Sequence, residues 1–501
     1  MYPNIQRDTG ISLREVLTKS RIIGPQDIRV TSCCSDSRRC REGDLFIAQL
    51  GTKHDGHDFV AEAVKRGASA VLAERYLPTE IPTCLVPDSR EAYGQVCQAL
   101  AGDPSQKTHV IGVTGTSGKT VTGLLITGIL EEAGHRVGVI SSLGYCDSIE
   151  TAQVTDRSPT QPELGTWLAR MYANQCSHVV LEASSIALAQ RRLAGIELDA
   201  ACITNIRRDH LDFHGSVLNY RRANTRLFEH VRPDGFAIVN ADDPASRFFL
   251  SKLKHPTLTI GLQGDAELSA TIIERHKSEQ TFLINAGDEV IPVRTHMIGD
   301  QHVSHCLTAA AVGLVYGIDL PTIVRGLEKV SFVPGNLERI ECGQPYGVFV
   351  DQARSPDNLA IALKALRKVK DGRLICVFGA DGDRNQDTRP VMGRLVERYA
   401  DLGILTTDGA GMDPPLSVIH DVLDGYDRPS RAHILPDRSK AICWALSEAQ
   451  PGDTVLVAGQ GKLKLKIDNG HSQRFSDRDI IQAWLRQISS SNPMTGISAS
   501  Q

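Results

Sequence analysis

Short apolar runs alternate with stretches of helical spacing through the middle of this sequence. Four such runs, each bounded by turn residues or by a helix pattern, are Val137–Ser141, His178–Leu181, Ala200–Thr204 and Gly235–Asn240. Runs without polar alternation are typical of strands that are buried on both faces. Their alternation with helix patterns therefore predicts a parallel α/β sheet covered by helices on both sides.

The two ends of the chain show similar patterns. Near the amino end, the predicted strands Asp44–Ala48 and Ala70–Ala73 flank a helix pattern at Asp58–Gly67. Toward the carboxyl end, a helix pattern at Asp357–Val369 lies among predicted strands at Gly347–Asp351, Arg373–Gly379, Gly403–Thr407 and Asp453–Ala458. This second pattern predicts an open α/β sheet of the Rossmann-like kind.

The chain length indicates several domains, because 501 residues correspond to about three domains of roughly 150 residues. Turn-rich segments at Gly102–Ser105 and Val333–Gly335 suggest the boundaries. We expect an α/β protein with an amino-terminal domain at 1–106, a central domain at 107–332 and a carboxyl-terminal domain at 333–488. The Ser-rich tail at 489–501 is predicted to be disordered.

The composition excludes several classes of protein. A formal net charge of −4 gives no sign of a nucleic-acid partner. No run approaches the roughly 18 apolar residues that a membrane span requires, and the polar start at Met1–Gly10 does not resemble a signal peptide. We expect a cytoplasmic monomer with small-molecule substrates. The 12 cysteines show no Cys-x-x-Cys spacing, so we expect buried thiols in a reducing compartment rather than a thiolate metal site.

The segment Gly112–Thr120 carries the strongest chemical signal. It reads Gly-Val-Thr-Gly-Thr-Ser-Gly-Lys-Thr, follows an apolar run and leads into a helix pattern at Val121–Ala133. Backbone N–H groups at a helix N-terminus favour an anion, and glycines allow the backbone to close around phosphate oxygens. In such a loop Lys119 contacts the terminal phosphates and Thr120 ligates Mg²⁺. The segment predicts a site for ATP with Mg²⁺; a Gly-rich turn without a ligand is the alternative.

Polar segments follow other predicted strands of the central domain, at the edge where a parallel sheet places its ligands. Glu182 stands where a nucleotide site has a Mg²⁺ ligand. The segment Thr204–Gly215 contains two His and two Asp within six positions, which indicates either chemistry or a solvated loop. In the amino-terminal domain, the polar loops Ser35–Arg38 and Gly51–Gly56 are either ligand contacts or plain turns.

Together these motifs resemble those of the Mur ligases, the ATP-dependent amino-acid ligases of peptidoglycan synthesis. In the central and carboxyl-terminal domains the shared motifs are the phosphate loop, Glu182–Ser185, Thr204–Asp212, Val377–Gly379 and Gly382–Arg384. In the amino-terminal domain, Ser35–Arg38, Gly43–Phe46 and Asp55–His57 match the family's uridine-binding region. The resemblance covers about residues 30–480 and is strongest to the tripeptide synthetases, which add the third residue of the stem peptide. It implies the three-domain Mur-ligase architecture with a central P-loop domain.

The resemblance implies a ligase that activates a carboxylate of a UDP-muramyl-peptide as an acyl-phosphate, which an amino acid then attacks. It implies catalytic roles for Lys119, Glu182 and His210, with Mg²⁺ held by Thr120, Glu182 and His210. The ATP site implied by the family consists of Gly115, Thr116, Ser117, Gly118, Lys119, Thr120, Asn205, Asp351 and Arg384. The implied UDP-substrate site consists of Ser37, Lys53, His54, Ser158, Ser184, Gln190 and Arg192.

Several positions depart from the family pattern. Asn224 replaces the lysine that is carbamylated to help bind a second Mg²⁺, and Asn336 replaces the arginine that approaches the γ-phosphate. Gly411 replaces the arginine of the selectivity loop, so the bidentate partner for a diaminopimelate carboxylate is missing. The remaining departures are at Arg157–Ser158, Ile186, Gln301–His305, Gln352, Arg354–Ser355, Gly409–Ala410 and Gln460–Leu463.

These departures leave two main hypotheses. The first is an altered ligase, in which the new cations Arg354 and Lys462 compensate for the lost ones. The second is a catalytically degenerate paralogue that binds ATP or UDP-muramyl-peptide in a regulatory or scaffold role. A related ligase acting on a folate is a minor third hypothesis, because the amino-terminal motifs are of the uridine-binding type.

Overall fold

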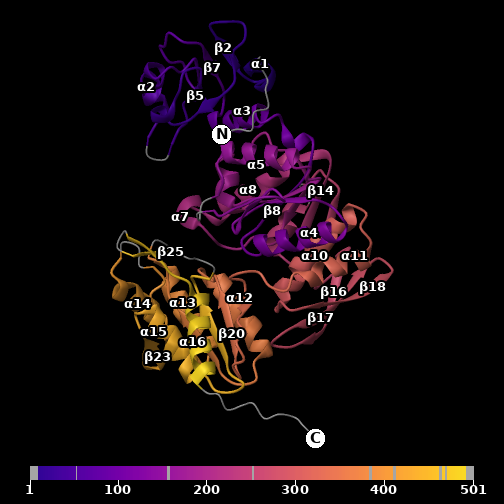
Figure 1. Ribbon diagram of the computed structural model, residues 1–501, viewed down its shortest axis with the longest axis vertical. Coiled ribbons are helices and arrows are strands. Elements are labelled where there is room, and N and C mark those ends of the chain that lie inside the picture. Colours follow the sequence, from indigo (N-terminus) through magenta and orange to yellow (C-terminus); the bar gives the residue numbers. More distant parts are fainter. Residues whose placement is uncertain are drawn as a thin grey trace.

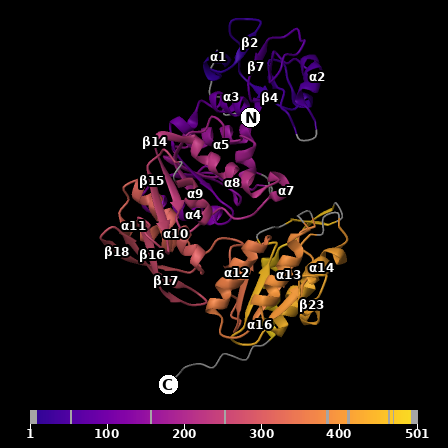
Figure 2. The same cartoon turned by 180° about the vertical axis from the view of Figure 1, so that it is seen from behind.

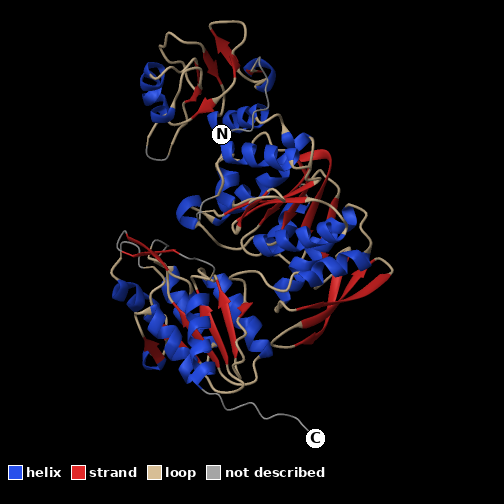
Figure 3. Cartoon of the chain, in the orientation of Figure 1, coloured by secondary structure: helices blue, strands red, loops and turns tan. Residues whose placement is uncertain are grey.

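The structure is a computed structural model that describes residues 10–51, 54–154, 158–250, 253–382, 386–409, 413–461, 465–468 and 471–491. Three α/β domains follow one another along the longest axis, with the amino-terminal domain at one end and the central domain in the middle (Figure 1). The view from behind shows the same order (Figure 2). In each domain helices surround a sheet (Figure 3).

The amino-terminal domain is built on a small mixed sheet. Its strand order is β2 (Arg21–Ile23), β7 (Thr83–Leu85), β6 (Ala70–Ala73), β5 (Leu45–Ile47) and β4 (Cys33–Cys34). Strand β2 is antiparallel to β7, and the others are parallel. A separate antiparallel pair joins β1 (Ile11–Ser12) to β3 (Arg29–Val30). The helical segments are α1 (Leu13–Val16), η1 (Ser37–Arg39), η2 (Gly56–Phe59), α2 (Val60–Lys65), α3 (Ser89–Leu100) and, at the domain junction, η3 (Pro104–Gln106).

The central sheet is parallel in its middle and antiparallel at both edges. In spatial order its strands are β11 (Thr151–Ala152), β10 (Gly144–Cys146), β9 (Val137–Ser141), β12 (His178–Glu182), β8 (His109–Thr114), β13 (Leu198–Ile203), β14 (Val231–Asn240), β15 (Thr257–Gly261), β16 (Leu268–Arg275), β17 (Gln280–Ala286) and β18 (Glu289–Thr295). Strands β9 to β16 in this order pair in parallel. The antiparallel additions, β10–β11 at one edge and β16–β18 at the other, were not predicted.

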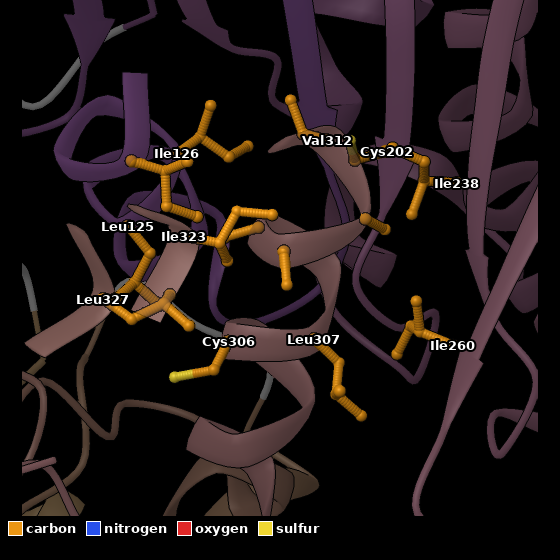
Figure 4. Close-up of a cluster of buried hydrophobic side chains, with 14 of the residues drawn as sticks. Leu125, Ile126, Cys202, Ile238, Ile260, Cys306, Leu307, Val312, Ile323 and Leu327 are labelled. Carbon is orange, nitrogen blue, oxygen red and sulfur yellow. The ribbon is translucent and has the colours of Figure 1, made fainter. Parts of the chain in front are cut away.

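Helices cover both faces of this sheet, as the pattern predicted. One face packs against α4 (Lys119–Glu132), α10 (Asp300–Val315) and α11 (Leu320–Lys329). Figure 4 shows Leu125 and Ile126 of α4, Leu307 of α10 and Ile323 of α11 in this core. The opposite face packs against α5 (Gln161–Ala173), α6 (Ser185–Ala189), α8 (Val217–Thr225) and α9 (Pro244–Leu250), and the short α7 (Leu211–His214) and η4 (Arg226–His230) flank α8.

The carboxyl-terminal domain has a second open sheet. Its strand order is β19 (Glu338–Arg339), β20 (Gly347–Asp351), β24 (Thr454–Ala458), β21 (Leu374–Phe378), β22 (Leu402–Leu405) and β23 (Ala432–Ile434), and only β19 is antiparallel among these described strands. Helices α12 (Pro356–Val369), α13 (Thr388–Tyr399) and α14 (Pro415–Leu423) contribute to the core on one face, and α15 (Arg438–Glu448) and α16 (Asp477–Ser491) to that on the other. The remaining elements are η5 (Pro429–Arg431) and the hairpin β25 (Leu465–Asp468) to β26 (His471–Arg474).

Two further findings concern the carboxyl-terminal tail and the length and apolar character of the helices. Helix α16 continues to Ser491, so the first three residues of the tail predicted to be disordered are helical, and residues 492–501 lie outside the described residues. Over the part of the chain that the structure describes, no helix is both long enough and apolar enough to span a bilayer.

Candidate active site

The Gly-rich loop connects the end of β8 to the start of α4, as the motif requires. Helix α4 begins at Lys119, and its N-cap Gly118 has a φ of 82°. Gly115 has a φ of 143°, and a Cβ there would lie 2.1 Å from Thr204 Oγ1. A Cβ on Gly118 would lie 1.9 Å from His305 Nε2. Both positions therefore need glycine, for the positive φ and for the close approach of a neighbouring element.

Side chains that follow β13 hold the loop in shape. Asn205 Oδ1 accepts from the backbone N–H and from the hydroxyl of Ser117, both at 3.2 Å. Asn205 Nδ2 and Thr204 Oγ1 both donate to the Ser117 carbonyl, at 3.0 and 2.7 Å. The Thr116 and Tyr220 hydroxyl oxygens lie 2.8 Å apart. The loop is thus fixed by neighbouring strands and by α8 before any ligand arrives.

Lys119 folds back over its own loop. Its Nζ donates to the carbonyl oxygens of Gly115 at 2.9 Å and Thr116 at 3.3 Å. The ammonium group therefore stays beside the row of backbone N–H groups, which is the position from which it can neutralise phosphate oxygens.

A carboxylate and two hydroxyl groups meet beside the first turn of α4. Glu182, the last residue of β12, accepts at Oε2 from Thr120 Oγ1 at 2.9 Å and from the backbone N–H of Ser142 at 3.0 Å. The Ser142 hydroxyl oxygen lies 3.0 Å from Thr120 Oγ1. Ser142 directly follows β9, and its position at the carboxyl end of a parallel strand is the signal that could have identified it.

The loop, Glu182 and the carboxyl-terminal domain enclose a cavity of about 250 Å³. Residues of the central domain on its wall include Lys119, Thr120 and Glu182, and those of the carboxyl-terminal domain include Asn336, Asp351 and Arg354. Asp351 Oδ2 accepts from the backbone N–H of Leu337 at 2.7 Å. Burial raises the pKa of Asp351 to about 7.

Arg354 adds a cation to the same wall. Its Nε donates to the carbonyl oxygen of Gly459 at 3.2 Å, which ties the side chain to the end of β24. Across the cavity, Lys119 and Thr120 belong to the phosphate loop. The arrangement places basic groups of two domains around a space next to a helix N-terminus, which suits an oligophosphate.

Three family models match the chain along its length. A model described as the Mur ligase middle domain matches residues 113–313, one described as the glutamate ligase domain of Mur ligases matches 337–461, and one described as the Mur ligase family catalytic domain matches 29–98. The UDP-N-acetylmuramoyl-L-alanyl-D-glutamate–2,6-diaminopimelate ligase of Syntrophomonas wolfei is 35% identical over 469 residues, which cover 92% of this chain and 96% of the relative. The protein of the same name from Chlorobium phaeobacteroides is 37% identical over 486 residues, covering 93% and 94% of the two chains. The chain belongs to the Mur ligase family.

Solved structures agree with this assignment. A UDP-N-acetylmuramoyl-L-alanyl-D-glutamate–2,6-diaminopimelate ligase superposes with a TM-score of 0.69 at 25% identity, over 96% of this chain and 99% of the other. The MurF ligase of Thermotoga maritima in complex with ADP shares the fold, with a TM-score of 0.63 at 20% identity over 91% and 98% of the two chains. The family models and the whole-length relatives assign this Mur ligase to the ATP-dependent ligases.

The structure brings together four residues that the sequence predicted at the UDP-substrate site of this Mur ligase. The hydroxyl oxygens of Ser158 and Ser184 lie 2.6 Å apart. Arg192 donates from Nη1 to the Ser158 carbonyl at 2.6 Å and from Nη2 to Gln190 Oε1 at 2.7 Å. These groups form one polar cluster beside α6.

Other predicted substrate residues are placed differently. Ser37 is only 5% exposed, and its hydroxyl donates to Glu62 Oε2 at 2.8 Å, which supports the turn; its contact with the substrate stays a prediction. His54 is exposed, with its ring edge-on to Phe59 at 6.2 Å between ring centroids. Lys53 and the predicted ATP contact Arg384 lie outside the described residues, as does Lys462.

His210 is not among the residues that line the cavity, so its catalytic and metal-binding roles stay predictions. It is the N-cap of α7, with a left-handed φ of 49°, and its Nε2 lies 3.7 Å from Asp209 Oδ2. The neighbouring Asp209 is the residue of this segment on the cavity wall. The backbone turn at His210 directs the two adjacent side chains to different places.

Asn224 is completely buried beneath the phosphate loop. The Thr114 hydroxyl donates toward Asn224 Oδ1 at 2.9 Å and toward the Ala183 carbonyl at 2.7 Å. Asn224 Nδ2 donates to the backbone carbonyl of Tyr220 at 2.9 Å. The position of the family lysine is therefore occupied by a neutral side chain whose amide is hydrogen-bonded at both ends.

Two histidines of α10 stand where the family pattern has asparagines that help to seat adenine. His305 is buried against Gly118 and lines the cavity, and burial lowers its pKa to about 4. His302 Nε2 lies 3.1 Å from Thr295 Oγ1, and burial lowers the pKa of His302 to about 3. Both rings are neutral at physiological pH, so they can replace amides without adding charge.

Proposed function

We propose that this Mur ligase joins an amino acid to a UDP-N-acetylmuramyl-peptide through an acyl-phosphate formed with ATP. The observation that carries the proposal is the shared cavity: the phosphate loop faces Asp351 and Arg354 of the carboxyl-terminal domain. The polar cluster of Ser158, Ser184, Gln190 and Arg192 gives an adjacent set of donors and acceptors for the second substrate. Relatives that match over the whole length carry the names of such ligases.

Lys119 and Arg354 would neutralise the charge that develops as the γ-phosphoryl group is transferred. In this proposal Arg354 replaces the family arginine that is Asn336 here, because both residues line the same cavity wall. The carboxylate of the peptide and the γ-phosphate would meet in the cavity, where positioning supplies much of the rate.

Glu182 and Thr120 fit a single Mg²⁺ ion. They provide a carboxylate and a hydroxyl, the oxygen donors that Mg²⁺ prefers, and their oxygen atoms lie 2.9 Å apart. When bound, Mg²⁺ neutralises charge between the β- and γ-phosphates. A second metal site is not part of the proposal, because Asn224 is neutral and His210 does not line the cavity.

The incoming amino acid is proposed to lack a distal carboxylate. Gly411 stands at the position of the selectivity arginine, so a diaminopimelate carboxylate has no bidentate partner there. The relatives named as diaminopimelate ligases therefore serve as guides to the reaction and not to this substrate.

The proposal is tested by phosphate release from Mg-ATP in the presence of UDP-muramyl-dipeptide and a panel of single amino acids. Release that requires both the dipeptide and one amino acid, together with the mass of the extended product, supports the ligase. Calorimetry on the same protein measures ATP and UDP-dipeptide binding. Binding of ATP or UDP-dipeptide without phosphate release for any amino acid would instead support the degenerate paralogue. The neutral, hydrogen-bonded amide of Asn224 favours that alternative.

A further inference from the structure

A cluster of metal-ligating side chains lies outside the cavity, in the amino-terminal domain. One ligand atom each of Cys34, Cys40 and Asp44 lies within 4.8 Å of the other two. Cys34 ends β4, Cys40 directly follows η1, and Asp44 directly precedes β5. The fold thus brings together a set with Cys-x5-Cys-x3-Asp spacing, which matches none of the common thiolate motifs and was not predicted from the sequence.

The Asp44 carboxylate is held in place by neighbouring donors. The Ser32 hydroxyl donates to Oδ1, and the backbone N–H of Arg41 donates to Oδ2 at 2.8 Å. Each carboxylate oxygen retains a second lone pair. Outer-shell hydrogen bonds of this kind orient the carboxylates that ligate metals.

Access to the cluster is from one side. Cys40 and Asp44 are each 7% exposed, whereas Cys34 is partly exposed. Cys33, the neighbour of Cys34 in β4, packs against the opposite hydrophobic cluster, and its Sγ lies 3.9 Å from Cys97 Sγ. The two adjacent cysteines therefore face different sides of the sheet, and only Cys34 belongs to the cluster.

Burial and the nearby Asp44 carboxylate raise the pKa of both thiols, because a thiolate there would be poorly solvated and close to a negative charge. A divalent cation removes this penalty, because it stabilises the thiolates and the carboxylate together.

We propose that Cys34, Cys40 and Asp44 bind one zinc ion, with water as the fourth ligand on the side of Cys34. Tetrahedral zinc keeps sulfur and oxygen ligands about 3.5–3.8 Å apart, so the ligand atoms would move closer together by at most about 1.3 Å from their present separation of up to 4.8 Å. On binding, two Zn–S bonds and one Zn–O bond form, and the two thiol protons leave to solvent.

The ion would connect both ends of the turn that contains η1. Residues 35–39 lie between the two cysteines, and Ser37 within them is hydrogen-bonded to Glu62 of α2. Zinc would therefore restrain β4, the turn and the start of β5 as one unit. This inference does not depend on the ligase reaction and concerns a site in another domain.

The test uses the full-length protein, reduced and stripped of metal with a chelator, and titrated with Zn²⁺ against a chromophoric competitor. One equivalent should bind, with release of two protons measured in weakly buffered solution. Co²⁺ in place of zinc should give thiolate-to-cobalt charge-transfer absorption. Cys34→Ser, Cys40→Ser and Asp44→Asn should each weaken zinc binding by at least about tenfold, whereas Cys33→Ser, on the opposite face, should not.

Circular dichroism identifies variants that fail to fold. Asp44→Asn keeps the size and shape of the side chain, so it still tests the site if a cysteine variant does not fold. Equal zinc binding by the wild type and by folded Cys34→Ser and Asp44→Asn would place the metal elsewhere and overturn the proposal. Absence of zinc binding by the reduced wild type would overturn it as well. The two thiols would then be expected to form a Cys34–Cys40 disulfide instead, which is detected by mass after air oxidation and alkylation.

Discussion

The Thr114 hydroxyl donates toward Asn224 Oδ1 at 2.9 Å, directly beneath the phosphate loop. Strand β8, which carries the loop, is therefore joined to α8 through a neutral pair at the position of the family lysine. We expect Asn224→Lys to raise kcat on the order of tenfold or more, because a carbamylated lysine supplies the missing anionic metal ligand. The gain should require bicarbonate and Mg²⁺ in the phosphate-release assay.

Asn224→Met is the matched control, because methionine is similar in length to lysine and cannot be carbamylated. It should lose stability without gaining activity, since it replaces an amide that is hydrogen-bonded to Thr114 and Tyr220 by a longer apolar side chain in a fully buried site. If Asn224→Lys folds and its activity is the same with and without bicarbonate, the metal site does not limit the reaction.

Arg354 is predicted to supply the charge that Asn336 lacks. Arg354→Ala should lower kcat by about 10²–10³-fold, because it removes a fixed cation from the transition-state site. Arg354→Lys should retain part of the rate. Adding Asn336→Arg to Arg354→Ala should restore activity, and a double variant as slow as the single one would show that the two positions are not interchangeable.

Arg192 is predicted to position the UDP-substrate. Arg192→Leu removes its hydrogen bonds to Ser158 and Gln190 and should raise KM for the UDP-dipeptide on the order of 10- to 100-fold. KM for ATP should stay the same. Arg325→Leu, which breaks an ion pair with Glu132 between α11 and α4, serves as the control and should change neither constant. Equal effects on both substrates would indicate a general loss of structure.

Asp408 should make the carboxyl-terminal domain less stable as pH rises. Its carboxylate oxygens have no hydrogen-bond partner among the described residues, and burial raises its pKa to about 6. A raised pKa means that the folded state holds the proton more tightly than the unfolded state. Stability is therefore lost as pH rises from about 4 to about 6, by at most about 2–3 kcal/mol.

Asp408→Asn cannot ionise and should remove this loss. Urea unfolding followed by fluorescence, with Trp444 and Trp484 as reporters in this domain, measures the effect at pH 4.5 and pH 7.5 in roughly matched ionic strength. The stability of the variant relative to wild type should be greater at the higher pH. A difference that is independent of pH would mean that Asp408 keeps an ordinary pKa.

The sequence predicted the fold best where strands are buried on both faces. The runs Val137–Ser141 and Gly347–Asp351 coincide with β9 and β20, because continuous apolar positions have no other place in a layered domain. Strand β16 was missed, since it alternates buried and exposed positions and most of its second half is exposed. The sequence of such a strand alone gives only a weak strand pattern, and its pairing with β15 and β17 is what defines it.

The positions of the site residues were predictable where the geometry of the phosphate loop fixes them. Lys119, Thr120 and Glu182 lie together as expected, because a P-loop fixes its neighbours at the ends of parallel strands. The sequence could not show that Asp209 rather than His210 lines the cavity, since the left-handed backbone at His210 separates the two side chains. The Cys34, Cys40 and Asp44 cluster required the turn around η1, whose shape no residue pattern specified.

His305 and Gly118 share one small space beside the phosphate loop. The imidazole of His305 occupies the space into which any side chain on Gly118 would project, since a Cβ there would lie 1.9 Å from the ring nitrogen. A smaller residue at 305 would leave a gap beside the loop, and it would still not allow a side chain at Gly118, because Gly118 has a left-handed φ of 82°. The ring of His305 and the bare backbone of Gly118 therefore fit each other as a pair, so that α10 limits the width of the phosphate loop although the two segments lie far apart in the sequence.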